Sequence, residues 1–264
     1  MNKNGRRTVL VTGGAKGIGQ SISIEMARAG YDVAVNYHNR RGMAEETKAE
    51  IEKLGRDCFL IHADMGDLKS IENMYNEVYN YFEDLDVVVN NAGVGKEVYF
   101  LDTTEEDFDF MNLVDWKGLF FSSQYAAKRM IEHNNKGVII NVSSNQSVGC
   151  WPRSTVYAPV KAAVDKFTKN CAMEMAPYGI RVVAIAPGYT NVGWPKGDIR
   201  LEAEARLPLK RFASTKEIAK GCIYLASEDA DYITGFTLTI DGGALLPVVA
   251  ENDFVKGVPV DNKQ

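Results

Sequence analysis

Residues 8–19 read TVLVTGGAKGIG, a short apolar run followed at once by a turn that holds four glycines. The run Thr8–Thr12 has the composition of a buried strand, and residues 17–29 have the apolar period of a helix. Glycines between a strand and a helix allow a tight turn and let the backbone approach a pyrophosphate at the helix N-terminus. A glycine cluster alone is weak evidence, so a plain strand–helix turn is the alternative. The turn predicts a phosphate site formed by Gly13, Lys16, Gly17, Ile18 and Gly19.

The rest of the chain alternates short β-rich apolar runs with longer stretches of helical period. Strands are predicted at Thr8–Thr12, Asp32–Tyr37, Cys58–Ala63, Asp86–Asn90, Gly137–Val142, Arg181–Ala186 and Thr237–Ile240. Helices are predicted at 17–29, 42–54, 67–82, 104–134, 155–176 and 214–227. The last of these helices opens with Ser214 and Glu217 at the spacing of a capping box.

This alternation predicts an α/β fold, namely a single-domain, Rossmann-type, doubly wound parallel sheet of about seven strands with helices on both faces. Residues 1–243 are expected to form a dinucleotide-binding catalytic domain. The tail 244–264 mixes apolar residues with Pro and Gly and has no clear period. Because a free tail is usually more polar, we expect this one to dock on the body or on a neighbouring subunit.

Composition narrows the classes of function. The 264 residues carry a net charge of −5, which argues against nucleic acid or an anionic membrane as a partner. No apolar run approaches the roughly 18 residues that a transmembrane helix needs. The four cysteines lack the spacing of a disulfide framework, which favours reduced thiols and a cytoplasmic protein. The three histidines are widely separated, so we expect no metal site and no Ser-His-Asp hydrolase.

The end of the second strand bears on the identity of the dinucleotide. A fold that prefers NAD usually places Asp or Glu there, to hydrogen-bond the free ribose hydroxyl. Here the strand runs into Arg40 and Arg41 with no acid before Glu45, and Lys16 adds a cation in the glycine turn. These cations predict a 2′-phosphate and hence NADP(H). The alternative is that they are exposed charges at the start of a helix.

Tyr157 and Lys161 lie four residues apart, on one face of a predicted helix. Roughly one such pair is expected by chance among 12 tyrosines, so the pattern alone is weak evidence. Ser144 strengthens it, because this residue follows the apolar strand Gly137–Val142.

With these motifs in order, the chain resembles the short-chain dehydrogenase/reductase family over about residues 6–243. The resemblance rests on the glycine turn, Asp64, Asn90–Gly93, Ser144, Tyr157, Lys161, Pro187, Gly188 and Asp241–Gly243. Within the family the chain is most similar to sugar (glucose-type) dehydrogenases and 3-oxoacyl-thioester reductases. The resemblance also implies a homotetramer, and small residues on the predicted helix 155–176 would allow close packing across a symmetric interface.

The resemblance implies a role for each motif. Tyr157 would protonate the carbonyl oxygen as hydride arrives, or deprotonate the alcohol in reverse, and Ser144 would hydrogen-bond the same oxygen. Lys161 would hold the ribose hydroxyls and favour the phenolate; at about 4 Å its charge supplies on the order of 4 kcal/mol. Cofactor contacts are expected from Asp64, Met65, Asn91, Ala92, Gly93, Tyr157, Lys161, Pro187, Gly188 and Thr190.

The sequence departs from the family at two site positions. Asp115 stands where the family carries a catalytic Asn that holds a water next to the lysine, and Val192 stands where Thr is common. We expect Asp115 to accept from the same water, to act in the proton relay and to disfavour the phenolate by its charge. The alternative is that Asp115 points away, or pairs with a local cation and only caps a helix kink.

The substrate is expected to be a small carbonyl or alcohol compound: a sugar, polyol, ketone, keto ester or acyl thioester. Substrate contacts should come from loops at the carboxyl ends of the strands, with candidates Asn145, Trp151, Arg153, Tyr189 and Trp194. A non-enzymatic NADP-binding sensor or scaffold could share this fold. The intact set of Ser144, Tyr157 and Lys161 favours an enzyme, because a binding protein has no need of it.

Overall fold

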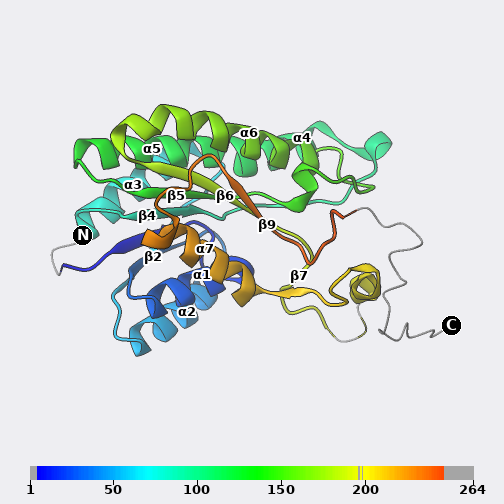
Figure 1. Ribbon diagram of the computed structural model, residues 1–264, viewed down its shortest axis with the longest axis horizontal. Coiled ribbons are helices and arrows are strands. Elements are labelled where there is room, and N and C mark those ends of the chain that lie inside the picture. Colours follow the sequence, from blue (N-terminus) through cyan, green and yellow to red (C-terminus); the bar gives the residue numbers. More distant parts are fainter. Residues whose placement is uncertain (1–4, 196, 198, 247–264) are drawn as a thin grey trace.

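Seven parallel strands form the central sheet in the computed structural model, which describes residues 5–195, 197 and 199–246 (Figure 1). In chain order they are β1 (Thr8–Val11), β2 (Asp32–Tyr37), β3 (Cys58–His62), β4 (Val87–Asn90), β5 (Val138–Val142), β6 (Arg181–Pro187) and β9 (Thr237–Ile240). They lie in the order β3-β2-β1-β4-β5-β6-β9, and every neighbouring pair is parallel. Each predicted strand is present, with ends that differ by at most one residue.

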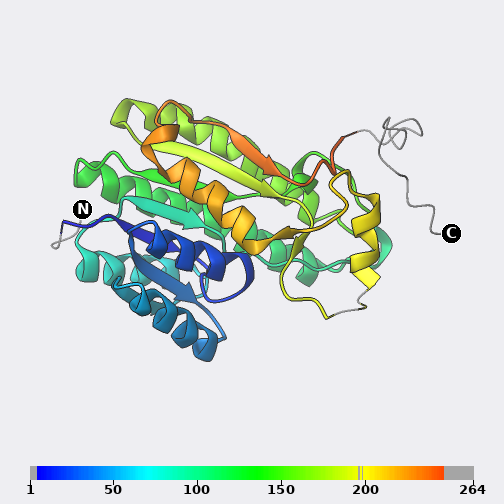
Figure 2. The same cartoon turned by 60° about the horizontal axis from the view of Figure 1, so that its bottom comes forward.

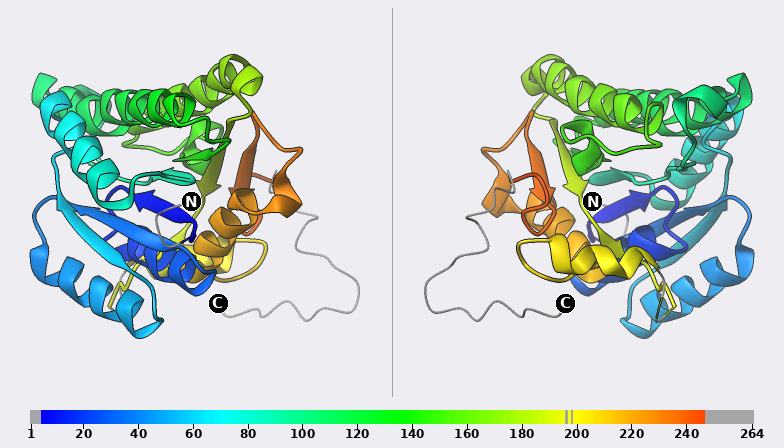
Figure 3. Two further views of the ribbon diagram at one scale, coloured as in Figure 1. Left: turned by 90° about the vertical axis from the view of Figure 1, so that its left-hand side faces the viewer. Right: turned by 90° about the vertical axis from the view of Figure 1, so that its right-hand side faces the viewer.

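Helices cover both faces of the sheet, as Figures 1 and 3 show. One layer holds α1 (Gly17–Arg28), α2 (Arg41–Lys53) and α7 (Thr215–Ala226), and Figure 2 brings the adjacent α1 and α7 to the front. The opposite layer holds α3 (Leu68–Phe82), α4 (Glu105–Met111), α5 (Leu119–Glu132) and α6 (Tyr157–Met175). This arrangement confirms the predicted doubly wound fold.

Two apolar cores lie on the two sides of the sheet. Along β1, Val9 and Val11 pack into the core shared with α1 and α7, whereas Leu10 packs into the core shared with α3 and α5. All three side chains are fully buried. Because both faces of a parallel sheet are covered, its strands are apolar throughout and do not alternate with polar residues.

The order of the strands reverses at β1, which lies between β2 and β4. The chain leaves β1 towards β2 on one side and returns later to β4 on the other, so a crevice forms beyond their carboxyl ends. Segments far apart in the sequence meet there: the backbone N–H of Asn91 donates to Thr12 Oγ1 over 3.0 Å. The fold therefore brings the glycine turn and the segment after β4 together.

The helix predicted over 104–134 is present as one continuous helical stretch from Glu105 to Glu132, but a π-helical turn interrupts its α-helical hydrogen bonding. α4 ends at Met111, a π-helical turn, η2, spans Asn112–Gly118, and α5 begins at Leu119. Gly118 passes so close to the Met65 carbonyl that a β-carbon at this position would collide with it. A π turn adds residues to a helical turn without ending the helix, so apolar periodicity does not reveal it.

Several short elements extend this frame. β7 (Thr190–Asn191) pairs with β8 (Ala213–Ser214) beyond the end of β6, and neither strand was predicted. Single helical turns form η1 (Phe100–Asp102), η3 (Asn145–Ser147), η4 (Ala176–Tyr178) and η6 (Glu228–Ala230), and η5 (Ile199–Arg206) is a longer 3₁₀ segment. In the part of the chain that the structure describes, no helix is long and apolar enough to cross a membrane.

The predicted tail is described only at its beginning. The backbone N–H of Leu245 donates to Asp241 Oδ2 over 2.9 Å, and the N–H of Leu246 donates to the Gly243 carbonyl over 2.9 Å. Residues 244–246 therefore fold back on the segment after β9. Residues 247–264, and with them most of the tail that we expect to dock, lie outside the described residues.

Candidate active site

The glycine turn after β1 has the backbone geometry that its sequence predicts. Gly13 and Gly17 have φ values of 61° and 56°, which favour glycine over other residues. At Gly19 a β-carbon would collide with the Gly13 carbonyl and the Asn91 amide. The turn can therefore follow this tight path only because these positions lack side chains.

Two asparagines hold this turn in place. Asn36, in β2, accepts the Gly13 N–H at Oδ1 over 3.0 Å and donates from Nδ2 to the Ala63 carbonyl over 3.1 Å. The Asn91 amide donates to the carbonyls of Thr12, over 2.9 Å, and Gly13, over 3.2 Å. We expected Asn91 to face a cofactor, but its amide hydrogen faces the turn. Asn36 is not among the predicted site residues, although a buried Asn within an apolar strand is a usable signal.

Basic residues lie at the outer end of the crevice, where the second strand finishes. Lys16 and Arg40 are exposed and precede the first residues of α1 and α2. Arg41 Nε lies 3.4 Å from Glu45 Oε1 in an exposed ion pair. Asp64 accepts the Gly66 N–H over 2.8 Å and lies 3.9 Å from His38 Nδ1. Of the residues predicted to contact a 2′-phosphate, Arg41 is therefore paired with a carboxylate, whereas Lys16 and Arg40 have no ion pair among the described residues.

The end of β5 is joined to α6 at the predicted catalytic residues. Ser143 Oγ donates to the Lys161 carbonyl over 3.2 Å, and Lys161 Nζ donates to the Val142 carbonyl over 3.2 Å. Lys161 is buried, and its Nζ lies 5.5 Å from the centre of the Tyr157 ring. Ser144, also buried, follows β5 directly and accepts the Gln146 N–H at Oγ over 3.2 Å. The serine segment, the tyrosine and the lysine thus gather at one edge of the sheet.

Asp115 joins this group and does not point away from it. Its carboxylate is fully buried; Oδ1 accepts the Val94 N–H over 2.7 Å, and Oδ2 lies 3.1 Å from Lys161 Nζ. Burial acts to lower the pKa of Lys161, but Asp115, with Tyr157 and Asp165, outweighs it, so the pKa lies above its usual value. Lys161 is therefore held as an ammonium.

A chain of buried polar side chains lies directly under the site. Asn90 donates to Ser123 Oγ over 2.9 Å and to Asn141 Oδ1 over 3.0 Å, and Ser122 donates to Asn90 Oδ1 over 2.6 Å. Asn141 in turn donates to Thr168 Oγ1 over 3.0 Å. These bonds connect β4, α5, β5 and α6, and they fix the helix that carries Tyr157 relative to the sheet. None of these hydrogen bonds was predicted from the sequence.

Aromatic residues from separate loops form a cluster in the region where substrate contacts are predicted. Trp151 Nε1 donates to the Tyr189 hydroxyl over 2.9 Å. The Tyr189 ring stacks on Phe212 with centroids 5.1 Å apart, and Trp194 meets Phe212 edge-on at 5.5 Å. Three of the predicted substrate residues are thus brought together, and Phe212 was missed. Arg153, the fourth candidate in these loops, lies 2.9 Å from Glu97 in an ion pair.

Three buried polar atoms follow Ser144 in η3. Asn145 Nδ2, Gln146 Oε1 and Ser147 Oγ have no hydrogen-bond partner among the described residues. Asn145 Nδ2 also lies beside Gly188, within 3.2 Å of where a β-carbon would stand. Asn145, predicted to contact the substrate, therefore lies between Ser144 and the segment after β6.

The segment after β6 approaches the glycine turn. Thr190 is buried and donates from Oγ1 to the Gly188 carbonyl over 3.1 Å, and Gly188 packs so closely on Asp241 that a side chain would not fit. Val192 lies about 3.7 Å from the position of a Gly17 β-carbon. Pro187, Gly188 and Thr190 therefore border the same crevice as the turn, on the side nearer Ser144.

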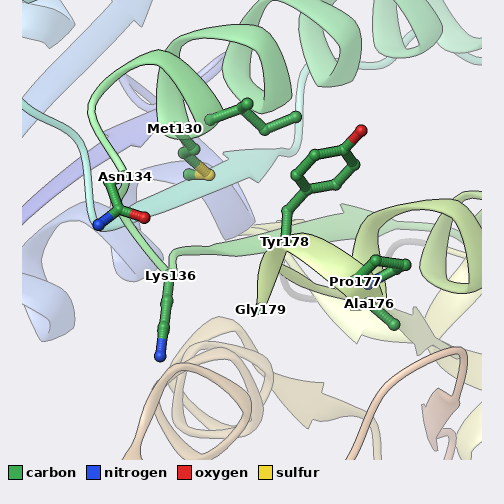
Figure 4. A pocket seen from close by; sticks show the side chains of 8 residues that line it. Met130, Asn134, Lys136, Ala176, Pro177, Tyr178 and Gly179 are labelled. Atoms are coloured by element: carbon green, nitrogen blue, oxygen red, sulfur yellow. The ribbon is translucent and has the colours of Figure 1, made fainter.

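A different surface pocket lies away from this crevice (Figure 4). It is bounded by Met130 and Asn134 at the end of α5, Lys136 before β5, and Tyr178 and Gly179 before β6. These residues border the amino ends of β5 and β6, whereas the catalytic candidates border the carboxyl ends. In parallel open sheets, ligands bind at the carboxyl ends, so this pocket is not the candidate active site.

Known proteins resemble the chain along nearly all of the part that forms the fold. A family model described as enoyl-(acyl carrier protein) reductase matches residues 13–244. The 3-oxoacyl-acyl-carrier-protein reductase FabG of Staphylococcus aureus is 36% identical over 240 residues, which cover 90% of this chain and 97% of that protein. The chain belongs to the short-chain dehydrogenase/reductase family.

Solved structures of short-chain dehydrogenases agree with this membership. A short-chain dehydrogenase from Burkholderia cenocepacia, in complex with NADP, has a TM-score of 0.84 and 31% identity, with 89% of this chain and 96% of that chain covered. Acetoin dehydrogenase from Enterobacter cloacae has a TM-score of 0.84 and 33% identity, with 90% and 96% covered. As a short-chain dehydrogenase/reductase, the protein is an oxidoreductase that acts on CH–OH and C=O groups.

Proposed function

We propose that the protein is an NADP(H)-dependent oxidoreductase that interconverts a small carbonyl compound and its alcohol. The observation that carries this proposal is the cluster of Ser144, Tyr157 and buried Lys161 at the carboxyl end of β5, beside the glycine turn. A sensor or scaffold that only binds a dinucleotide needs the turn but not the cluster.

The crevice fits the dinucleotide. The glycines at 13, 17 and 19 keep the turn tight at the start of α1, where backbone N–H groups can bind a pyrophosphate, and Lys16 and Arg40 offer positive charge where a 2′-phosphate would lie. Lys161 would hold the ribose hydroxyls, and Pro187, Gly188 and Thr190 would border the nicotinamide. When bound, NADPH supplies the hydride. A relative from Burkholderia cenocepacia described in complex with NADP supports this choice of cofactor.

The protein's own residues donate and accept the proton. In reduction, the Tyr157 hydroxyl gives its proton to the carbonyl oxygen as negative charge develops there, and the Lys161 ammonium stabilises the phenolate that remains. Ser144 Oγ hydrogen-bonds the same oxygen and fixes its distance from Tyr157. In oxidation, the phenolate accepts the proton of the alcohol. The buried network beneath α6 keeps these groups in position.

The substrate is a small hydroxylated or keto compound such as a sugar, polyol, ketone or keto ester. Trp151 and Tyr189 offer an aromatic surface for the carbon skeleton of such a ligand, and Asn145, beside Gly188, offers a polar group near Ser144. Reduction of a 3-oxoacyl thioester is the second candidate, which the similarity to FabG supports. A panel of sugars, polyols, ketones and acyl thioesters separates the two.

We also propose that the protein assembles as a homotetramer. An open, mainly apolar groove runs between α5 and α6, with Trp116, Phe120 and Phe167 on its walls. Trp116 meets Phe120 and Phe167 edge-on at centroid distances of 5.8 and 5.5 Å. A face of this kind on two helices supports close packing against a second copy.

The substitution Tyr157→Phe tests the proposed chemistry. We expect kcat/KM to fall roughly a hundredfold or more, because the proton donor is lost, while the Kd for NADPH changes little, because the ring still packs. Tyr178→Phe, at the exposed pocket of Figure 4, is the matched control and should retain full activity. Turnover near the wild-type rate in Tyr157→Phe would refute the proposal. Tight NADPH binding without turnover of any panel substrate would favour the sensor.

A further inference from the structure

Asp115 contacts Lys161 directly, although the two residues lie far apart in the sequence. Oδ2 lies 3.1 Å from Nζ, in a buried ion pair. The Asp115 side chain is fully buried, and Lys161 is nearly so. A carboxylate so deeply buried requires a cation and hydrogen-bond donors in compensation. The Val94 N–H supplies the donor, and Lys161 supplies the cation.

The local backbone is arranged to make this contact. Asp115 lies in the π-helical turn between α4 and α5, where it and Gly118 are buried while Lys117 is exposed. On the facing segment Gly93 has no side chain, and a β-carbon there would lie 3.2 Å from Asp115 Oδ2. The widened helical turn and Gly93 therefore leave room for the Asp115 carboxylate between the two segments. Such turns often mark functional positions in helices.

In the described part of the chain, the groups around the pair come from α6, the segment after β4 and the end of β5. From α6 come Lys161 itself, Tyr157 one turn before it and Asp165 one turn after it; Asp165 accepts from Thr237 Oγ1 over 3.2 Å. The segment after β4 presents the Val94 N–H, and the end of β5 presents the Val142 carbonyl and the Ser143 hydroxyl. The positive charge beside Tyr157 is thus opposed at close range by the negative charge of Asp115.

We propose that Asp115 is a positioning residue that pairs with the Lys161 ammonium and cancels much of its charge at Tyr157, so that Tyr157 keeps its proton to higher pH. The inference rests on the proposed function, in which Tyr157 is the acid. A lone ammonium would favour the phenolate strongly, whereas a neutral ion pair favours it less. The enzyme therefore keeps its proton donor, and carbonyl reduction continues, under more alkaline conditions.

The variant Asp115→Asn tests this inference without a known substrate. Tyrosines are isotopically labelled on the ring, and the Tyr157 resonance is identified by its loss in Tyr157→Phe. We expect the titration of this resonance to move to lower pH by about one unit or more in Asp115→Asn. Asp115→Glu, which keeps the charge, should restore the wild-type midpoint. If Asp115→Asn does not fold, Asp115→Ser also removes the charge and takes its place.

Two further measurements sharpen the result. Asp107→Asn is the matched control, because Asp107 is a buried acid on the neighbouring α4 that pairs with Lys96, and it should leave the midpoint unchanged. With a substrate in hand, the alkaline limb of reduction and the acidic limb of oxidation should both move to lower pH in Asp115→Asn. Coincident titrations, or a shift to higher pH, overturn the inference. If the Tyr157 titration shifts as expected but the protein turns over no substrate, the proposed function is wrong and the inference about Asp115 stands.

Discussion

Lys16 and Arg40 are the residues on which cofactor preference should depend. Both are exposed at the crevice, and neither forms an ion pair among the residues that the structure describes, whereas Arg41 pairs with Glu45. The double variant Lys16→Ala/Arg40→Ala should weaken NADPH binding by about tenfold per lost charge-assisted contact, and NADH binding much less. Arg41→Ala is the comparison and should have the smaller effect. Equal and unchanged affinities for both cofactors would contradict this prediction.

Single residues also show what part of the site a sequence can reveal. Tyr157 and Lys161 are four apart on one helix, so their shared face follows from helical geometry alone. Asn36 and Phe212 act through partners far away in the sequence, namely Gly13 and Tyr189. No local pattern encodes those contacts, because they arise only when the sheet brings the loops together.

At the scale of elements, a strand could be predicted where its apolar run is long enough to recognise and turn residues bound it. β2 and β9 were predicted with their observed ends, because turn residues bound their apolar runs. The π turn Asn112–Gly118 was not foreseen, since it interrupts neither the apolar period nor the helical composition. The strands β7 and β8 have only two residues each, too few to establish a period. The position of Asp115 therefore required the structure.

The start of α7 gives a prediction about pH and stability. The predicted capping box is confirmed, with Glu217 Oε2 accepting the Ser214 N–H over 2.8 Å and the Ser214 side chain accepting the Glu217 N–H. Hydrogen bonds from Arg211 and Ser214 lower the pKa of Glu217 to about 2. The carboxylate thus contributes stability above its unfolded pKa of about 4.3, and the contribution is lost as the pH falls towards 2.

The variant Glu217→Gln should therefore be less stable than wild type at neutral pH, by about 0.5–1 kcal/mol after allowance for solvent screening. In urea unfolding, this difference should narrow as the pH is lowered from 5 to 3, since the wild-type carboxylate takes up a proton in the unfolded chain while it stays ionised in the folded one. Glu46→Gln, an exposed acid of α2 with no ion pair in the described structure, should show no such trend. A pH-independent difference would assign the effect to shape and not to charge.

At the scale of the whole molecule, the proposed catalytic and assembly surfaces lie on opposite sides of α6. One side of the helix carries Lys161 towards the sheet, and the other contributes Phe167 to the groove shared with α5. The buried network ties the same helix to β5 through Thr168. A subunit packed on the groove would therefore contact the helix that carries Tyr157 and Lys161. Assembly should then stabilise the arrangement of these two residues.

The groove gives a direct test of assembly. Phe120→Glu combined with Phe167→Glu places two like charges on the apolar face, so each copy that docks there would bury unpaired carboxylates. We expect sedimentation to show a tetramer for wild type and a smaller species for this variant, with a lower melting temperature. Tyr232→Glu, a fully exposed aromatic outside the groove, should sediment like wild type. A monomeric wild type, or a variant that remains tetrameric, would place the contacts between subunits elsewhere on the molecule.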